Sequence, residues 1–169
     1  MAKPNIDCLF LIFNQMKENS LHSCLFVNKE WCNIAVPILW KKYSKDFLFI
    51  EKGKSEKLFN TILSCLPLSS RQLLSDNDIK LPSTILLKTP LFNYISFCKF
   101  PYPGSVDEIV NMVFSEGSFR SSLRVNLLEQ EIYKLFVNNC KNIKKLCWRT
   151  LQLTFTIISR SVNMFFSTL

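Results

Sequence analysis

Residues 4–43 read PNIDCLFLIFNQMKENSLHSCLFVNKEWCNIAVPILWKKY, and this stretch decides the fold expected for the chain. Its apolar residues recur at intervals of three and four, which is the spacing of helices that bury one face. Three short helices are predicted, with apolar stripes Leu9, Ile12, Phe13 and Met16; Leu21, Cys24 and Leu25, followed by the pair Val27 and Trp31; and Trp31, Ile34, Ala35 and Ile38. About forty residues is a marginal length for an independent core, so we expect part of this apolar surface to be buried against a partner.

Polar residues indicate where these helices begin and end. Asn5 is placed to cap the first helix, and Asp7 puts a negative charge in its first turn, which suits the helix dipole. Asn19 and Ser20 interrupt the apolar pattern and predict a second cap. Pro37 has no backbone N–H, so the third helix is expected to bend or restart there.

In this register the stretch resembles an F-box. The family pattern has Leu-Pro and an acidic residue, an apolar pair, Ile-Leu or Ile-Phe, a Leu near the end of the first helix, and a second helix ending in Val with Trp four residues later. The matching residues, in register and without a gap, are Asp7, Leu9, Ile12, Phe13, Met16, Leu21, Cys24, Val27 and Trp31. The sequence departs from the pattern at Pro4-Asn5, which replaces Leu-Pro, and at Leu39-Trp40, which comes one residue early.

The resemblance implies that the first module docks on a Skp-family adaptor and, through it, on a cullin that carries the ubiquitin-transfer machinery. A protein substrate, whose identity the sequence does not reveal, would be the other partner. The residues expected to face the adaptor or to support that face are Leu9, Ile12, Phe13, Leu21, Leu25 and Val27. The expected core of the module is Met16, Cys24, Trp31, Ile34 and Trp40, with Trp40 closing it. The alternative is that all of these residues form one private core.

The whole chain is predicted to be mainly α: a three-helix F-box module (1–44), a helical region (45–139), and a segment resembling the start of a leucine-rich repeat with an apolar tail (140–169). In the helical region, further helices are predicted after a cap at Ser55, from Ser69, at Leu81-Pro82, at Thr89-Pro90, from a capping box at Ser105–Glu108 to Gly117, and from Ser121 or Ser122 to Asn139. Residues 100–104, FPYPG, are predicted to be a loop or hinge.

The last segment carries a second resemblance. Cys140, Ile143, Leu146 and Trp148 have the spacing that opens a cysteine-containing leucine-rich repeat, and the remaining sequence has room for one such repeat at most. The apolar tail from Leu151 was also considered as a membrane span. Arg160 near its middle makes insertion costly, so we expect no membrane association.

Composition and single residues argue against several other functions. The net charge is +8, but the basic residues are scattered and follow no nucleic-acid-binding motif, so no nucleic-acid partner is expected. The seven cysteines include no Cys-x-x-Cys pair and His22 is the only histidine, which argues against a metal site. One His, three Gly and no phosphate-binding loop give no catalytic set, so we expect neither enzymatic activity nor a cofactor.

The cysteines also indicate the compartment. No signal peptide precedes the first predicted helix, and an odd number of unpaired cysteines fits a reducing environment. We therefore expect an intracellular protein, cytoplasmic or nuclear. Two other functions remain open at this point: a freestanding helical interaction module that ignores the adaptor, and a competitor that occupies the adaptor without binding a substrate.

Overall fold

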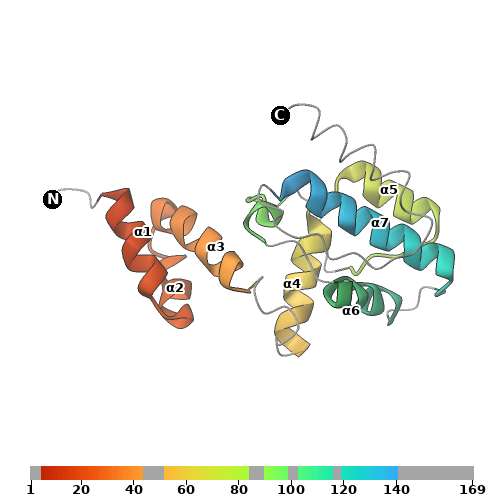
Figure 1. Cartoon of the computed structure of the whole chain (residues 1–169), viewed down its shortest axis with the longest axis horizontal. Coiled ribbons are helices and arrows are strands. Elements are labelled where there is room, and N and C mark those ends of the chain that lie inside the picture. The colour runs from red at the N-terminus through yellow and green to blue at the C-terminus, as the bar shows by residue number, and fades with distance from the viewer. Residues whose placement is uncertain (1–4, 44–51, 84–89, 99–102, 116–118, 141–169) are drawn as a thin grey trace.

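The computed structural model describes residues 5–43, 52–83, 90–98, 103–115 and 119–140 (Figure 1). The fold is mainly α, as the sequence predicts, and the described residues contain no strand. The elements are α1 (Ile6–Gln15), α2 (Glu18–Cys24), α3 (Lys29–Tyr43), α4 (Lys52–Ser64), α5 (Leu68–Asp76), the short 3₁₀ helix η2 (Tyr94–Phe97), α6 (Pro103–Ser115) and α7 (Ser122–Asn139).

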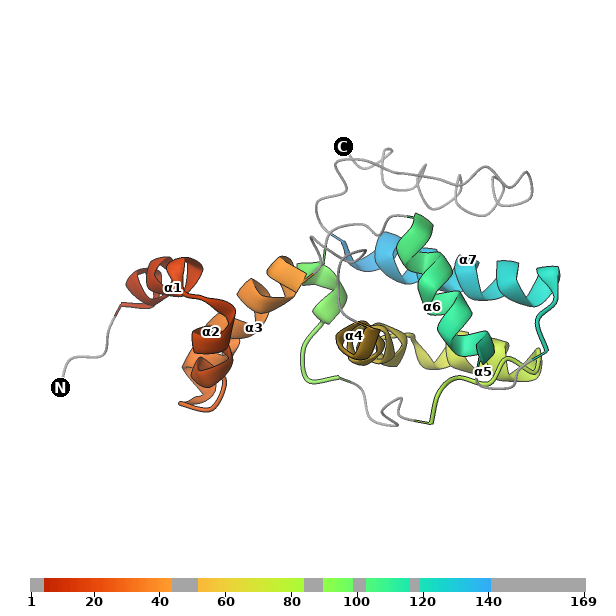
Figure 2. The same cartoon turned by 90° about the horizontal axis from the view of Figure 1, so that it is seen from below.

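The buried apolar side chains form two separate clusters. The smaller cluster lies within α1, α2 and α3 and includes Leu9, Phe13, Leu21 and Leu39. The larger one is built by α4 to α7 together with η2. Figures 1 and 2 show the same division, because α1–α3 lie beside the other helices and approach them through the end of α3. We call the two parts the first module and the second module.

The start of α1 follows the sequence prediction and the start of α2 does not. Asn5 caps α1, since its Oδ1 accepts a hydrogen bond of 3.0 Å from the backbone N–H of Asp7. The predicted cap at Asn19 and Ser20 is wrong, because both residues lie inside α2. The chain turns earlier, at Met16, whose extended backbone ends α1, and Glu18 supplies the acidic first turn of α2.

Helix α3 runs without a break from Lys29 to Tyr43 and includes Pro37, so the predicted restart there is wrong. Proline removes the hydrogen bond that its N–H would give to the carbonyl of Asn33. Asn33 is exposed, so water can satisfy that carbonyl. The helix is therefore long enough to belong to both modules.

Trp40 does not close the first module, which corrects its predicted role. Its ring packs on the larger cluster and lies 4.6 Å, centroid to centroid, from the ring of Tyr94 in η2. The reason is helical geometry. At 100° per residue, Trp40 points away from the face of α3 on which Ile34 and Ile38 meet α1 and α2.

Several element boundaries in the second module also differ from the predictions. Ser55 lies inside α4 and is buried, and α5 begins at Leu68. The sequence after Pro90 forms only the 3₁₀ helix η2, with Leu91 exposed. Ser105 does not form a capping box, because α6 already begins at Pro103, whose fixed φ suits the first position of a helix.

The buried apolar residues of the second module recur along the sequence at helical spacing. They include Phe59, Ile62, Leu63 and Leu66 near α4; Val106, Ile109, Val110, Val113 and Phe114 on α6; and Leu128, Ile132, Leu135 and Phe136 on α7. Ser121 caps α7 through its Oγ, as expected. The predictions for Thr89, residues 100–102, Gly117, the segment resembling a leucine-rich repeat after Cys140 and the apolar tail lie outside the described residues.

The core of the first module makes a prediction about stability. Phe13 is 1% exposed and meets the half-buried ring of Trp31 edge to face at 5.1 Å. Phe13→Ala should lower the free energy of unfolding by about 3–5 kcal/mol, and Trp31→Ala by about 1–3 kcal/mol, because part of the tryptophan ring remains in water. Urea denaturation followed by circular dichroism measures both changes.

Phe26→Ala is the matched control, since Phe26 is 87% exposed. It should change the free energy of unfolding by no more than about 0.5 kcal/mol. A Phe13→Ala variant as stable as the parent protein would contradict the described core.

Candidate protein-docking surface on the first module

Helix α1 has apolar residues on nearly every side, yet it buries only two of them. Leu9 and Phe13 face the core of the first module. Four other large apolar side chains remain at least half exposed: Ile6 at 54%, Phe10 at 50%, Leu11 at 67% and Ile12 at 56%. A helix that is hydrophobic all round is normally buried all round. The exposed side of α1 is therefore a candidate surface for contact with another protein.

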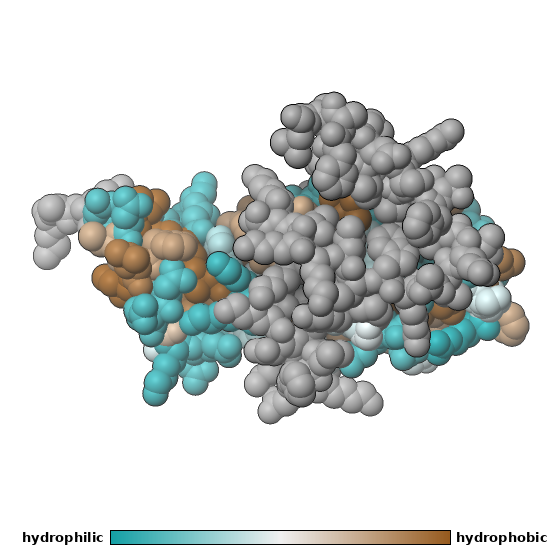
Figure 3. Space-filling view, in the orientation of Figure 1, coloured by the Kyte–Doolittle hydropathy of each residue, from teal (hydrophilic) through white to brown (hydrophobic). Residues whose placement is uncertain are grey.

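Two further apolar side chains are exposed in the turn that follows α2. Phe26 and Val27 lie between the end of α2 and the start of α3. Figure 3 shows hydrophobic residues gathered at the end of the molecule that α1–α3 form. We call the exposed apolar side chains of the first module the docking surface; they are Ile6, Phe10, Leu11, Ile12, Phe26 and Val27.

The docking surface flanks the core on both sides of α1. At 100° per residue, Ile6 and Phe10 lie on one flank and Ile12 on the other, while Leu11 points away from the core. A partner that covered only one flank would leave the other in water. The arrangement suits a concave partner surface that receives α1 along its length.

The rest of the first module holds α1 in place. α1 and α2 both pack on α3 through the smaller cluster. The Nζ of Lys42 near the end of α3 donates a hydrogen bond of 2.9 Å to the carbonyl of Met16, and Tyr43 contacts His22 of α2 through its hydroxyl. These contacts tie the end of α3 to α2 and to the turn before it, so the helices beneath the docking surface are held together.

The residues predicted from the sequence divide between this surface and the core beneath it. Ile12 and Val27 are exposed, and Leu25 is partly buried against the core. Leu9, Phe13 and Leu21 are buried, so they can support the surface but cannot face a partner. The predicted core residues Met16, Cys24, Trp31 and Ile34 lie in or against the smaller cluster. The exposure of Ile12 and Val27 disagrees with the alternative of one private core.

Sequence reasoning missed four members of the docking surface, namely Ile6, Phe10, Leu11 and Phe26. For Phe10 and Leu11 the signal was present in the run CLFLIF from Cys8 to Phe13. That run holds more apolar residues than one face of a helix can bury. A prediction based on one apolar stripe of the helix does not show these additional apolar residues.

Neither metal chemistry nor a membrane span is found in the described part of the chain. None of its His, Cys, Asp and Glu residues gather in groups of three or more that could hold a metal ion. None of the helices described here is both long and apolar enough to cross a bilayer. Comparison with protein-family models, curated proteins and solved structures found no match to this chain.

Three thiols of the second module are buried or partly buried. Burial raises the pKa of Cys65 and of Cys140 to about 11, and it raises the pKa of Cys98 still further. All three surround η2, since Cys140 donates to the carbonyls of Ile95 and Cys98. At neutral pH these thiols stay protonated, and the thiolate is the nucleophilic form.

This burial predicts a pH dependence of alkylation. At pH 8 iodoacetamide should modify the exposed Cys8 readily and Cys65, Cys98 and Cys140 slowly, as measured by peptide mass spectrometry. Because folding raises these three pKa values above the ordinary 9.0, the stability they contribute is present below pH 9 and falls as the pH rises from there toward 11. Equal labelling rates for Cys8 and Cys98 in the folded protein would contradict the structure.

Proposed function

We propose that the chain is a subunit of an SCF-type cullin–RING ubiquitin ligase and that its first module docks on a Skp-family adaptor. The observation that supports this most is the docking surface on α1, whose apolar side chains are exposed on a module too small to bury them. The resemblance of residues 4–43 to an F-box names the class of partner that this surface would meet. The ligase works inside the cell, in the cytoplasm or nucleus, where unpaired cysteines persist.

The contribution of this chain would be positioning rather than catalysis. Ubiquitin transfer belongs to the other subunits, and a receptor raises the local concentration of a substrate lysine near the activated ubiquitin. Helix α3 suits that task because it is continuous from the first core to the contact between Trp40 and Tyr94. Docking through α1 would therefore also fix where the second module stands.

The same surface would also serve an interaction module that binds a different protein. In that case the chain would still need a cover for α1, but it would not co-purify with the adaptor. A competitor that occupies the adaptor without a substrate would bind through the same side chains as a receptor. The experiment below separates the first of these alternatives from the proposed function.

Ile12→Asp tests the adaptor contact directly. Ile12 is 56% exposed, so a carboxylate there is tolerated in the free protein but would be desolvated in an apolar interface. Co-expression with a Skp-family adaptor, followed by affinity purification, should recover the adaptor with the parent chain. Binding by the variant should be weaker by at least about tenfold, since the penalty of one unpaired charge exceeds 1.4 kcal/mol.

Leu123→Asp is the matched control, because Leu123 is 78% exposed on α7, outside the first module. Circular dichroism should show both variants folded, and the control should bind the adaptor as the parent does. Failure of the parent chain to bind any Skp-family adaptor would contradict the proposed function. Equal binding by the Ile12→Asp variant would place the contact elsewhere.

A further inference from the structure

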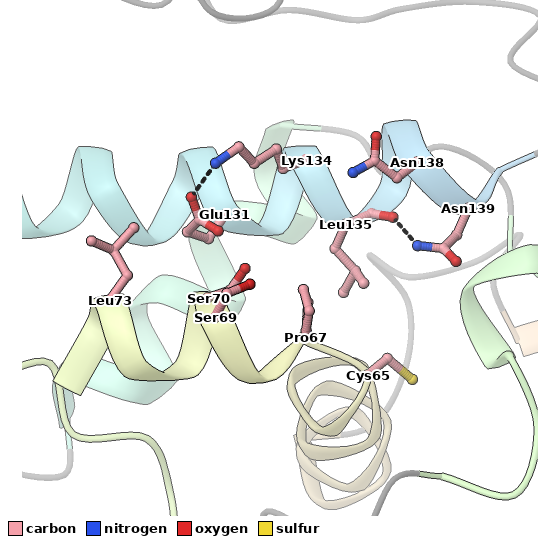
Figure 4. A pocket seen from close by; sticks show the side chains of 10 residues that line it. All are labelled: Cys65, Pro67, Ser69, Ser70, Leu73, Glu131, Lys134, Leu135, Asn138 and Asn139. Atoms are coloured by element: carbon pink, nitrogen blue, oxygen red, sulfur yellow. Dashed lines mark hydrogen bonds and ion pairs between the residues drawn. The ribbon is translucent and has the colours of Figure 1, made fainter. Parts of the chain in front are cut away.

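A groove of about 490 Å³ lies between α5 and α7 in the second module (Figure 4). One part of its wall is apolar and includes Pro67, Leu73 and Leu135. The other part is polar. The serines of α5, Ser69 and Ser70, lie opposite α7, and the carboxylate of Glu131 extends from α7 toward them. Such a mixture, an apolar wall with a few convergent polar groups, is typical of binding sites.

Glu131 is the unusual residue of this groove. It lies four residues before Leu135 and three after Leu128, so it occupies a core position of α7, and its side chain is only 3% exposed. An apolar residue there would usually be at least as stabilising, because burying a carboxylate removes its hydration. A buried carboxylate that lines a groove is a candidate ligand for a cationic group.

The internal partner of Glu131 is weak. Its Oε1 forms an ion pair of 2.7 Å with the Nζ of Lys134, which lies one turn along α7 and is 47% exposed. Because the lysine is half exposed, water screens part of its charge. The contact involves one carboxylate oxygen, so Oε2 is the atom left to receive a donor, and Figure 4 shows the carboxylate lying between α7 and the serines of α5.

We infer that this groove binds the side chain of a lysine presented by a partner protein. The ammonium group would donate to Glu131 Oε2, and the methylene stem would lie along Pro67 and Leu135. A single available oxygen suits the point charge of an ammonium group better than the planar fork of an arginine, which needs both carboxylate oxygens. Ser69 and Asn138, both exposed at the groove, can bond the peptide backbone on either side.

The charge of the chain indicates what surrounds that lysine. With a net charge of +8, the protein repels basic segments and attracts acidic ones. The ligand class is therefore a lysine within an acidic stretch of a partner.

This site lies outside the docking surface and does not depend on it. Glu131→Gln leaves the first module untouched, and Ile12→Asp leaves α5 and α7 untouched. The failure of either inference therefore leaves the other standing.

The test uses the full chain and an acetylated, amidated peptide of sequence Gly-Glu-Lys-Glu-Gly, with binding followed by ¹⁵N NMR titration. Peptide binding should shift the amide signals of Ser69, Ser70 and Glu131. Glu131→Gln, which keeps the shape of the side chain, should weaken binding by at least about tenfold because the ammonium loses its counter-charge. Lys134→Gln should strengthen binding, because it removes the competing ammonium; a merely structural role of Glu131 predicts no such gain.

Three matched probes define the ligand. A peptide with acetyl-lysine should not bind, one with arginine should bind more weakly, and butylamine alone should bind far more weakly than the lysine peptide. Glu108→Gln, which removes an exposed carboxylate on α6, should leave the affinity unchanged. The inference is overturned if the parent chain shows no shifts in the groove, if the acetyl-lysine peptide binds equally, if butylamine binds as tightly as the peptide, or if Glu131→Gln binds as the parent does.

Discussion

The arrangement of the chain depends on one feature of α1. This helix carries more apolar surface than its own module can bury. Leu9 and Phe13 are enough to hold α1 on α3, and the side chains of Ile6, Phe10, Leu11 and Ile12 remain in contact with water. Exposed apolar area of this kind costs free energy that association with another protein recovers. Among the described residues, the later helices build a separate core and do not supply the cover.

Helix α3 connects the module that carries this exposed surface to the second module. Residues from Ile34 to Leu39 complete the small core, and Trp40, which follows them, packs on Tyr94 of the second module. An uninterrupted helix is a stiff connection, so a partner held by α1 also holds α4 to α7 in a defined place. The groove between α5 and α7, with the buried carboxylate of Glu131, would then face a second protein from a fixed position.

The sequence predicted most of the helical faces and fewer of their ends. Stripes such as Ile109, Val110 and Val113 were visible because burial imposes a period on the sequence. Caps were less reliable, since Ser55 and Ser105 are good capping residues that tertiary packing placed inside helices. A serine that could begin a helix does not forbid the helix from beginning one turn earlier.

The sequence predicted only part of the docking surface. Ile12 and Val27 were found because they belong to a recognisable pattern, whereas Ile6, Phe10 and Leu11 fall outside its stripe and emerge only when exposure is known. Trp40 was assigned to the wrong core, because a sequence cannot show which of two neighbouring clusters a helix face will meet. The burial of Glu131 in a groove is not visible in the sequence, and only the packing of α5 against α7 reveals it.

Hydrogen–deuterium exchange of the full chain, with and without a Skp-family adaptor, tests the central claim most directly. If the surplus apolar surface of α1 is what the chain offers to its partner, peptides covering Ile6–Gln15 should exchange markedly more slowly in the complex, while those covering α7 stay unchanged. Exchange in α1 that does not respond to the adaptor, or that is already as slow in the free chain as in the core of α7, would contradict the account.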